Sequence, residues 1–257
     1  MAFMRAGIGV CLILGLLHGG ALASPKRSPA VTPIAREADW WQDRHQQINR
    51  QVRLRRPKVI LVGDSIIYGW RFVGRPVWRR RLGRVSTLNL GMDRDQTGHV
   101  LWRLQHGNLH RLARTVKVAV VQVGVNNAAQ RNQSPREIAA GIRAVVAELR
   151  RQLPRSRVLL LGILPAGRAR SALRRKIAAV NRLCAPVSDG RWVHFLDISS
   201  RLLDSEGRLP RTVSYDRLHL TEHGYSLYAT AMGPVLRRLL ASSAPSRTDR
   251  AGGGSNK

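Results

Sequence analysis

The sequence predicts an α/β protein built as a three-layer α/β/α sandwich around a five-stranded parallel sheet. Short apolar runs alternate with segments of helical period, which is the order of elements in doubly wound folds. Most of the runs are rich in Val, Ile and Leu without alternation, as expected of parallel strands covered on both faces. The expected strands are Lys58–Gly63, Ser86–Leu90, Lys117–Val123, Arg157–Ile163 and Trp192–Ile198.

The strongest helix signal is at Pro135–Gln152. Ser134 stands at the N-cap, Pro135 at the first helical position, and Glu137 completes a capping box. Three further segments have helical period: Glu37–Val52, Arg174–Leu183 and Glu222–Leu240.

The 257 residues suit one α/β domain with a leader and a tail. Arg5 precedes an apolar run that is too short to span a bilayer, and small residues follow at Ala21 and Ala23. We therefore predict a signal peptide at 1–23, a polar linker at 24–35, the domain at 36–241 and a disordered tail at 242–257. The expected location is the periplasm or the outside of the cell, and an uncleaved membrane anchor is the alternative.

The two cysteines provide no internal disulfide for the mature protein, since Cys11 lies in the leader. A lipoprotein role for Cys11 is disfavoured, because Val10 precedes it where a small residue is needed. Cys184 lies in a helix-like stretch, where a lone cysteine is expected to be a small buried apolar residue.

The formal net charge is +29, and arginine supplies most of the 44 basic residues. Such a surplus favours anionic partners, but the arginines are scattered and no nucleic-acid-binding motif is present. A specific nucleic-acid function is therefore not expected. Two interpretations stay open: a functional surface and a compositional bias toward arginine.

Three short motifs follow three of the predicted strands. Gly63-Asp64-Ser65 places a serine where a strand turns into a helix, and there a serine is either a nucleophile or a simple N-cap. Gly91 and Asn126 follow the next two strands and could donate hydrogen bonds to an oxyanion, or could be turn residues. Functional groups are expected at the carboxyl ends of parallel strands.

The segment before the last helix contains Asp216 and His219. A separation of three residues lets the carboxylate fix the imidazole tautomer, while a surface ion pair is the plain alternative. His223 raises a metal site, but its spacing lacks the order and third ligand of known zinc motifs, so no metal or other cofactor is expected.

In this order, the blocks G-D-S, Gly, G-x-N and D-x-x-H resemble those of the SGNH (GDSL-like) hydrolases. Stretches around Asn89–Gly91, His99–Leu104, Val123–Asn127 and Leu161–Pro165 are similar to the catalytic-subunit subgroup of the platelet-activating-factor acetylhydrolases. The likeness runs from about Val59 to Leu240 and implies a flavodoxin-like SGNH hydrolase fold.

The resemblance implies Ser65 as nucleophile, Asp216 and His219 as its activating pair, and an oxyanion hole made by Ser65, Gly91 and Asn126. Asp64 is expected to be structural. The chain departs from the family where Asp93 and Arg94 follow Gly91, since the family has small residues there.

The expected activity is hydrolysis of short-chain esters, acetyl esters first, through an acyl-enzyme. The narrowing effect of charged residues after Gly91 is the reason for a short chain. The substrate is a small acyl ester, with an acidic glycan or a lipid as candidate carriers. A lysophospholipase or thioesterase of the same mechanism and a non-catalytic binder of acidic envelope polymers are the alternatives. The oligomeric state and the natural substrate do not follow from the sequence.

Overall fold

The structure is a computed structural model, which describes residues 28–83, 85–130 and 132–242. Within this part of the chain, five strands form a parallel sheet in the order β2-β1-β3-β4-β5. The strands are β1 (Val59–Gly63), β2 (Thr87–Asn89), β3 (Val118–Gln122), β4 (Arg157–Leu161) and β5 (Val193–Leu196). Each lies inside the apolar run predicted for it, and the predicted fold class is confirmed.

Helices connect successive strands. The longer ones are α1 (Asp39–Leu54), α3 (Arg75–Arg81), α4 (Thr97–Arg103), α6 (Pro135–Gln152), α7 (Ala172–Cys184) and α8 (Glu222–Ala241). The short helical segments are α2 (Ser65–Tyr68), η1 (Gly69–Arg71), η2 (Leu104–Asn108), η3 (Leu112–Arg114), α5 (Val125–Ala129), η4 (Ala185–Val187) and η5 (Ser199–Arg201). The four predicted helices match α1, α6, α7 and α8 to within two residues at each end.

The capping box predicted for α6 is present. The Glu137 N–H donates to Ser134 Oγ over 3.3 Å, and the Ser134 N–H donates to Glu137 Oε2 over 2.8 Å. These two local bonds satisfy free donors at the helix start, which is why so short a sequence pattern located it correctly.

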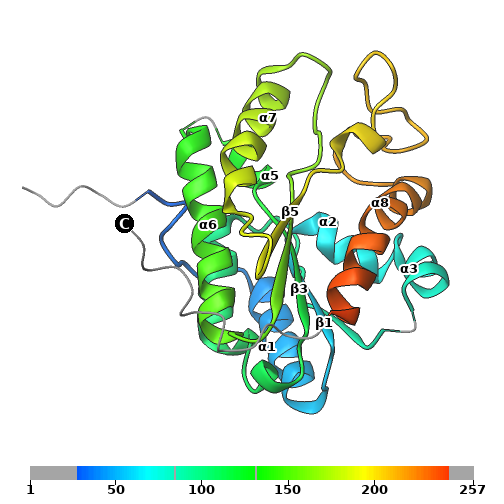
Figure 1. The fold of residues 1–257 in the computed structure, drawn as a ribbon. Coiled ribbons are helices and arrows are strands. Elements are labelled where there is room, and N and C mark those ends of the chain that lie inside the picture. The colour runs from blue at the N-terminus through cyan, green and yellow to red at the C-terminus, as the bar shows by residue number, and fades with distance from the viewer. Residues whose placement is uncertain (1–27, 84, 131, 243–257) are drawn as a thin grey trace, which may run out of the picture.

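The sheet is covered on both faces, which explains the continuous apolar runs. Along β1, Ile60 and Val62 pack in a core with α1, α4, α6 and α7, whereas Val59 and Leu61 pack in a second core with α2, α3 and α8. Figure 1 shows the layers, with α6 and α7 on one side of the strands and α3 and α8 on the other. Alternate side chains of one strand therefore both lie in apolar surroundings.

The described part of the segment predicted as a linker lies against the domain. Ala30 is fully buried, and its carbonyl oxygen accepts a hydrogen bond from Thr97 Oγ1 over 2.6 Å. The Ile34 N–H donates to the Gly98 carbonyl oxygen over 3.2 Å. The predicted signal peptide at 1–23 and all but the first residue of the predicted tail at 242–257 lie outside the described residues.

Two further sequence-based points concern single features. Cys184 is buried, and burial raises the pKa of its thiol to about 11, as expected of an unreactive packing residue. Among residues 28–242, apart from the two undescribed positions, no helix combines the length and apolar character needed to cross a bilayer.

Candidate active site

The candidate nucleophile lies at the first position of α2, directly after β1. Asp64 caps this short helix, since its Oδ1 accepts the Ile66 N–H over 3.1 Å. From the other side, Tyr225 of α8 donates its hydroxyl to the Ile66 carbonyl oxygen over 2.8 Å. The turn that presents Ser65 is therefore fixed by one local bond and one long-range bond.

A chain of hydrogen bonds joins three side chains from the two ends of the domain. The distance from His219 Nε2 to Ser65 Oγ is 3.2 Å, and that from His219 Nδ1 to Asp216 Oδ2 is 2.7 Å. This is the arrangement in which a carboxylate orients an imidazole and the imidazole takes a proton from a hydroxyl. The structure thus brings together the three residues predicted as the catalytic group.

The loop that carries Asp216 and His219 is shaped by the aspartate itself. Asp216 Oδ1 accepts the N–H groups of Leu218 and His219, over 2.9 and 2.8 Å, and the hydroxyl of Ser214 over 3.2 Å. Arg217 adopts a left-handed backbone conformation with φ of 63°, which turns the chain back on itself. The D-x-x-H spacing works because the carboxylate binds both its own loop and the imidazole.

Hydrogen bonding also sets the charge of the aspartate. Burial acts to raise the pKa of Asp216, but the hydrogen bonds from the His219 side chain and from the His219 and Leu218 N–H groups outweigh it and lower the pKa to about 2. Asp216 is therefore ionised at any physiological pH and can stabilise a protonated His219. Both side chains remain partly open to solvent, with exposed fractions of 46% for His219 and 41% for Asp216.

The predicted oxyanion donors follow the carboxyl ends of β1, β2 and β3. The Ser65 N–H is at a helix start, where helix geometry offers it no acceptor. Asn126 donates one hydrogen of its amide to the Asp95 carbonyl oxygen over 2.9 Å, so its side chain is held while a second N–H is left to donate.

Gly91 is required for a steric reason. A Cβ atom at this position would lie 2.5 Å from the Tyr68 backbone nitrogen and 2.8 Å from the Ile67 carbonyl carbon. Only a residue without a side chain allows the loop after β2 to approach the helix of the nucleophile so closely.

The Gly91 N–H is already engaged. It donates to Asn89 Oδ1 over 2.8 Å, and Asn89 Nδ2 donates to the Ile67 carbonyl oxygen over 2.7 Å. To serve an oxyanion as well, this N–H must share its hydrogen bond with Asn89. Asn89 was not predicted as a site residue, although it lies two residues before Gly91 at the same strand end.

A buried ion pair between Arg103 and Asp95 supports the loops that carry the oxyanion donors. Neither residue was predicted as part of the site. Arg103 Nε donates to Asp95 Oδ2 over 2.8 Å, and both side chains are fully buried. Arg103 Nη1 also donates to the carbonyl oxygen of Leu90 and to Asn108 Oδ1, and Trp41 Nε1 donates to Asp95 Oδ1. Because Asp95 in turn holds Asn126, this network positions both loops that supply the oxyanion donors.

Asp64, expected to be structural, is almost completely buried. Burial raises the pKa of its carboxyl to about 7, although the Ile66 N–H acts in the opposite direction. Since a raised pKa favours the protonated form in the folded state, this group costs folding free energy as pH rises from about 4 toward 7. Its role is to cap α2 rather than to react.

The described residues contain no group of three or more His, Cys, Asp or Glu side chains placed to hold a metal ion. His223, considered from the sequence, is exposed on the first turn of α8.

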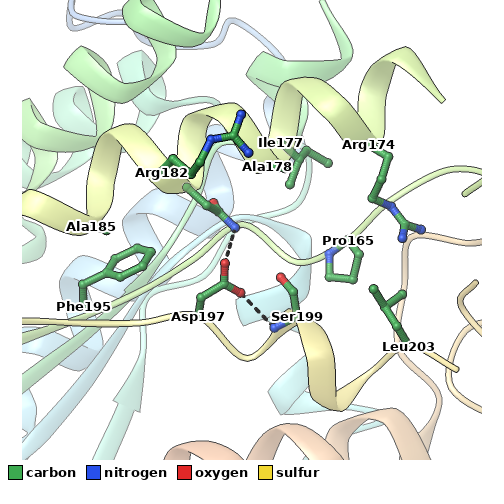
Figure 2. A pocket seen from close by; sticks show the side chains of 11 residues that line it. Pro165, Arg174, Ile177, Ala178, Arg182, Ala185, Phe195, Asp197, Ser199 and Leu203 are labelled. Carbon is green, nitrogen blue, oxygen red and sulfur yellow. Dashed lines mark hydrogen bonds between the residues drawn. The ribbon is translucent and has the colours of Figure 1, made fainter. Parts of the chain in front are cut away.

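Two cavities differ in their relation to this site. One, of about 10 Å³, is lined by Asp64 and Ile66 on either side of Ser65, by Val125 before Asn126 and by Leu218 before His219. The other, of about 380 Å³, lies beyond the end of β5 between α7 and η5, where Asp197 accepts hydrogen bonds from the Asn181 side chain and the Ser199 N–H (Figure 2). None of the five predicted site residues lines either cavity, but the first is lined by their immediate neighbours in the chain.

Comparison with known proteins agrees with the four blocks. The sequence profile of the GDSL-like Lipase/Acylhydrolase family matches residues 61–227. The chain belongs to this family. Its members' chemistry makes the chain an ester-hydrolysing serine hydrolase of the acylhydrolase class.

Relatives and solved structures extend the comparison. The chain is 33% identical over 219 residues to the platelet-activating factor acetylhydrolase IB subunit alpha1 of Rattus norvegicus, covering 85% of this chain and 91% of that protein. A GDSL-like lipase from Bacteroides thetaiotaomicron matches with a TM-score of 0.63 and 16% identity, covering 76% of this chain and 97% of that one. An acetylxylan esterase from Geobacillus stearothermophilus matches with a TM-score of 0.53 and 14% identity, covering 74% and 97%. The two structures share the fold.

Proposed function

We propose that this GDSL-like acylhydrolase hydrolyses short-chain carboxylic esters, acetyl esters first, through a covalent acyl-enzyme on Ser65. The observation that carries the proposal is the continuous hydrogen-bond chain from Ser65 through His219 to Asp216. This assembled chain also argues against a non-catalytic binder on the same fold, since binding alone requires none of its geometry.

In the first step, His219 Nε2 takes the Ser65 proton while Oγ attacks the ester carbonyl carbon. The negative oxygen that forms is stabilised by the Ser65 N–H, the Asn126 amide and the Gly91 N–H, the last shared with Asn89. The protonated His219, paired with ionised Asp216, then gives its proton to the leaving alcohol. Water repeats the sequence on the acyl-enzyme and releases the acid.

The preference for a short acyl chain rests on the small cavity beside Ser65. This cavity is lined by the neighbours of Ser65 and by none of the predicted site residues, and its volume of about 10 Å³ leaves room for about one water molecule, so it offers a long chain no preformed apolar space. Such a chain would forgo about 0.8 kcal/mol of burial per CH₂ group. The removal of acetyl groups named for the rat relative and for the Geobacillus enzyme supports the same choice.

Asp93 and Arg94, the charged pair after Gly91, narrow the acyl pocket less than the sequence predicted. The Arg94 side chain is 78% exposed and the Asp93 side chain is 45% exposed. The distance from Arg94 Nε to Asp93 Oδ2 is 3.7 Å. Since Arg94 projects into solvent, it does not form an enclosing wall. The proposal of a short acyl chain therefore rests on the small cavity and not on Asp93 and Arg94.

The deciding experiment compares kcat/KM for acetyl, butyryl and octanoyl esters of one phenol, with Ser65→Ala as the blank. The expected order is acetyl, then butyryl, then octanoyl. Preference for octanoyl would refute the short-chain proposal and favour a lysophospholipase or thioesterase. No hydrolysis of any ester by the folded wild-type protein would refute the esterase itself.

We also propose that the protein is exported, on the basis of the leader-like sequence at 1–23. N-terminal sequencing of the protein from a producing cell tests this. Ser24 as the first residue is the expected result, whereas an intact Met1 together with membrane attachment would favour an anchor.

A further inference from the structure

A third cavity, outside the catalytic group, is lined by arginines. It lies between α1, the edge strand β2 and η1, and its volume is about 440 Å³. Its lining contains four arginines and no Asp or Glu. The arginines are Arg44, Arg50, Arg55 and Arg71.

The deepest of these arginines is incompletely satisfied. Arg44 is 9% exposed, and its Nη2 donates to the Asn89 carbonyl oxygen over 3.0 Å, but its buried Nε has no hydrogen-bond partner among the described residues. Burial, and then the nearby Arg71, lower the pKa of Arg44 to about 10. A buried cation beside another cation is costly, and a bound anion would offset that cost.

The other arginines keep their donors available. No hydrogen bond or ion pair with a described residue involves the side chains of Arg50, Arg55 or Arg71. Arg71 instead lies over the Tyr68 ring at 5.3 Å, and Arg44 lies over the same ring at 5.4 Å. Tyr68 thus orients two guanidinium groups toward one region while consuming none of their N–H donors.

We propose that this cavity binds a phosphate-type anion, either free phosphate or a phosphate group carried by a larger molecule. Guanidinium groups match phosphate oxygens in geometry and charge, and Gln47, Gln51 and Thr87 add neutral polar groups to the lining. A concave site with several cations and no acid is suited to a compact, multiply charged anion. It does not have the extended form of a duplex-binding surface.

The site adjoins the catalytic machinery through two residues. Asn89 lines the cavity with Arg44 on its carbonyl oxygen, and its side chain holds the Gly91 N–H. Tyr68, under two of the guanidinium groups, ends the short helix that Ser65 begins. A phosphate group attached to an ester substrate could therefore be held beside the reaction site, an extension that rests on the proposed esterase function.

The first experiment measures binding of inorganic phosphate to the full chain by calorimetry at constant ionic strength. Wild type is compared with the Arg55→Gln/Arg71→Gln double variant and with Arg136→Gln, an exposed arginine of α6 outside the cavity. The double variant should bind phosphate about tenfold or more weakly, because it loses charge-assisted guanidinium bonds, while Arg136→Gln should bind like wild type. Equal affinity in all three proteins, or no binding by wild type, would overturn the proposal.

Arg44→Gln is a further variant, checked first for a wild-type unfolding curve because Arg44 also holds Asn89. If it folds, its phosphate affinity should fall as well. An unchanged affinity would contradict the role given to the buried guanidinium.

The second experiment distinguishes the two sources of phosphate. It compares kcat/KM for phenyl acetate and para-acetoxyphenyl phosphate in wild type and the double variant. Loss of about tenfold or more for the phosphate ester alone would identify a substrate subsite. Unchanged turnover of both esters, with phosphate binding lost, would identify a site for free phosphate. Phosphate binding is measured without turnover, so its result stands apart from any failure of the esterase.

Discussion

The active site has two sides that are built in opposite ways, one around His219 and one around the oxyanion donors. On one side, Asp216 and His219 stand on a loop and are almost half exposed, and local hydrogen bonds within that loop hold them. On the other side, Asp95 and Arg103 are fully buried and join segments from β2, α4 and α1. Substitutions on the exposed side should therefore lower activity and leave the fold intact. Substitutions on the buried side should lower the stability of the fold together with the positioning of the oxyanion donors.

The largest effect is expected at the nucleophile. Ser65→Ala should lower kcat by a factor on the order of 10⁶, because the variant lacks the hydroxyl on which the acyl-enzyme forms. The thermal unfolding midpoint should stay unchanged. A fluorophosphonate probe should label wild type at Ser65 and not label the variant. Labelling at another residue with activity retained would disprove the assignment.

Asp216→Asn should follow, with a loss of kcat of about 10⁴-fold, since an amide favours the wrong imidazole tautomer. Asparagine keeps an acceptor oxygen for the loop N–H groups, so circular dichroism and the unfolding curve should match wild type. Steady-state kinetics on a single acetyl ester measures the effect. A loss below tenfold would mean that the carboxylate is not needed to orient His219.

On the buried side, Arg103→Met should destabilise the protein by about 3–5 kcal/mol, because Asp95 would be left as an unpaired buried charge. Urea unfolding measures the change in the free energy of unfolding. Arg80→Met is the matched control, since Arg80 pairs with Glu222 at the surface and the two side chains are 62% and 52% exposed. Equal unfolding curves for the two variants would contradict the comparison of the two sides.

Asn126→Ala tests the oxyanion donor that the buried network holds through the Asp95 carbonyl oxygen. It should lower kcat by about 10²–10³-fold with little change in KM, as expected for the loss of a donor that acts in the transition state. The fold should persist, because Asn127 still ties this loop to Thr97 and Gln133. A change confined to KM would make Asn126 a substrate-binding residue instead.

The smallest expected effect is the change of kcat/KM with pH. The acid limb of kcat/KM should rise by about tenfold per pH unit and level off between pH 5 and 8, where histidine side chains lose their proton. Asp216 should not contribute, because its pKa is lowered to about 2 and it is ionised throughout this range. A flat profile between about pH 5 and 9 would exclude a histidine base.

The sequence by itself determined the sheet, the starts of α6 and α8 and the order of the site blocks. Apolar runs and capping patterns are local, and the carboxyl ends of parallel strands meet at one edge whatever the details of packing. For this reason the sequence alone predicted that Ser65, Asn126 and the Asp216–His219 pair lie at one edge of the sheet. The short D-x-x-H spacing added a contact that needs almost no tertiary information.

Only the tertiary structure decided which polar groups are buried together. Arg103 lies in one of the stretches that carry the family resemblance, but neither its residue type nor the helical period indicated that it would be buried against Asp95. In the same way Arg44 and Arg71 meet over Tyr68 from distant parts of the chain, and Arg94 extends into solvent where its sequence position suggested a wall. The environment of a charged side chain depends on long-range packing, which residue type and periodicity do not specify.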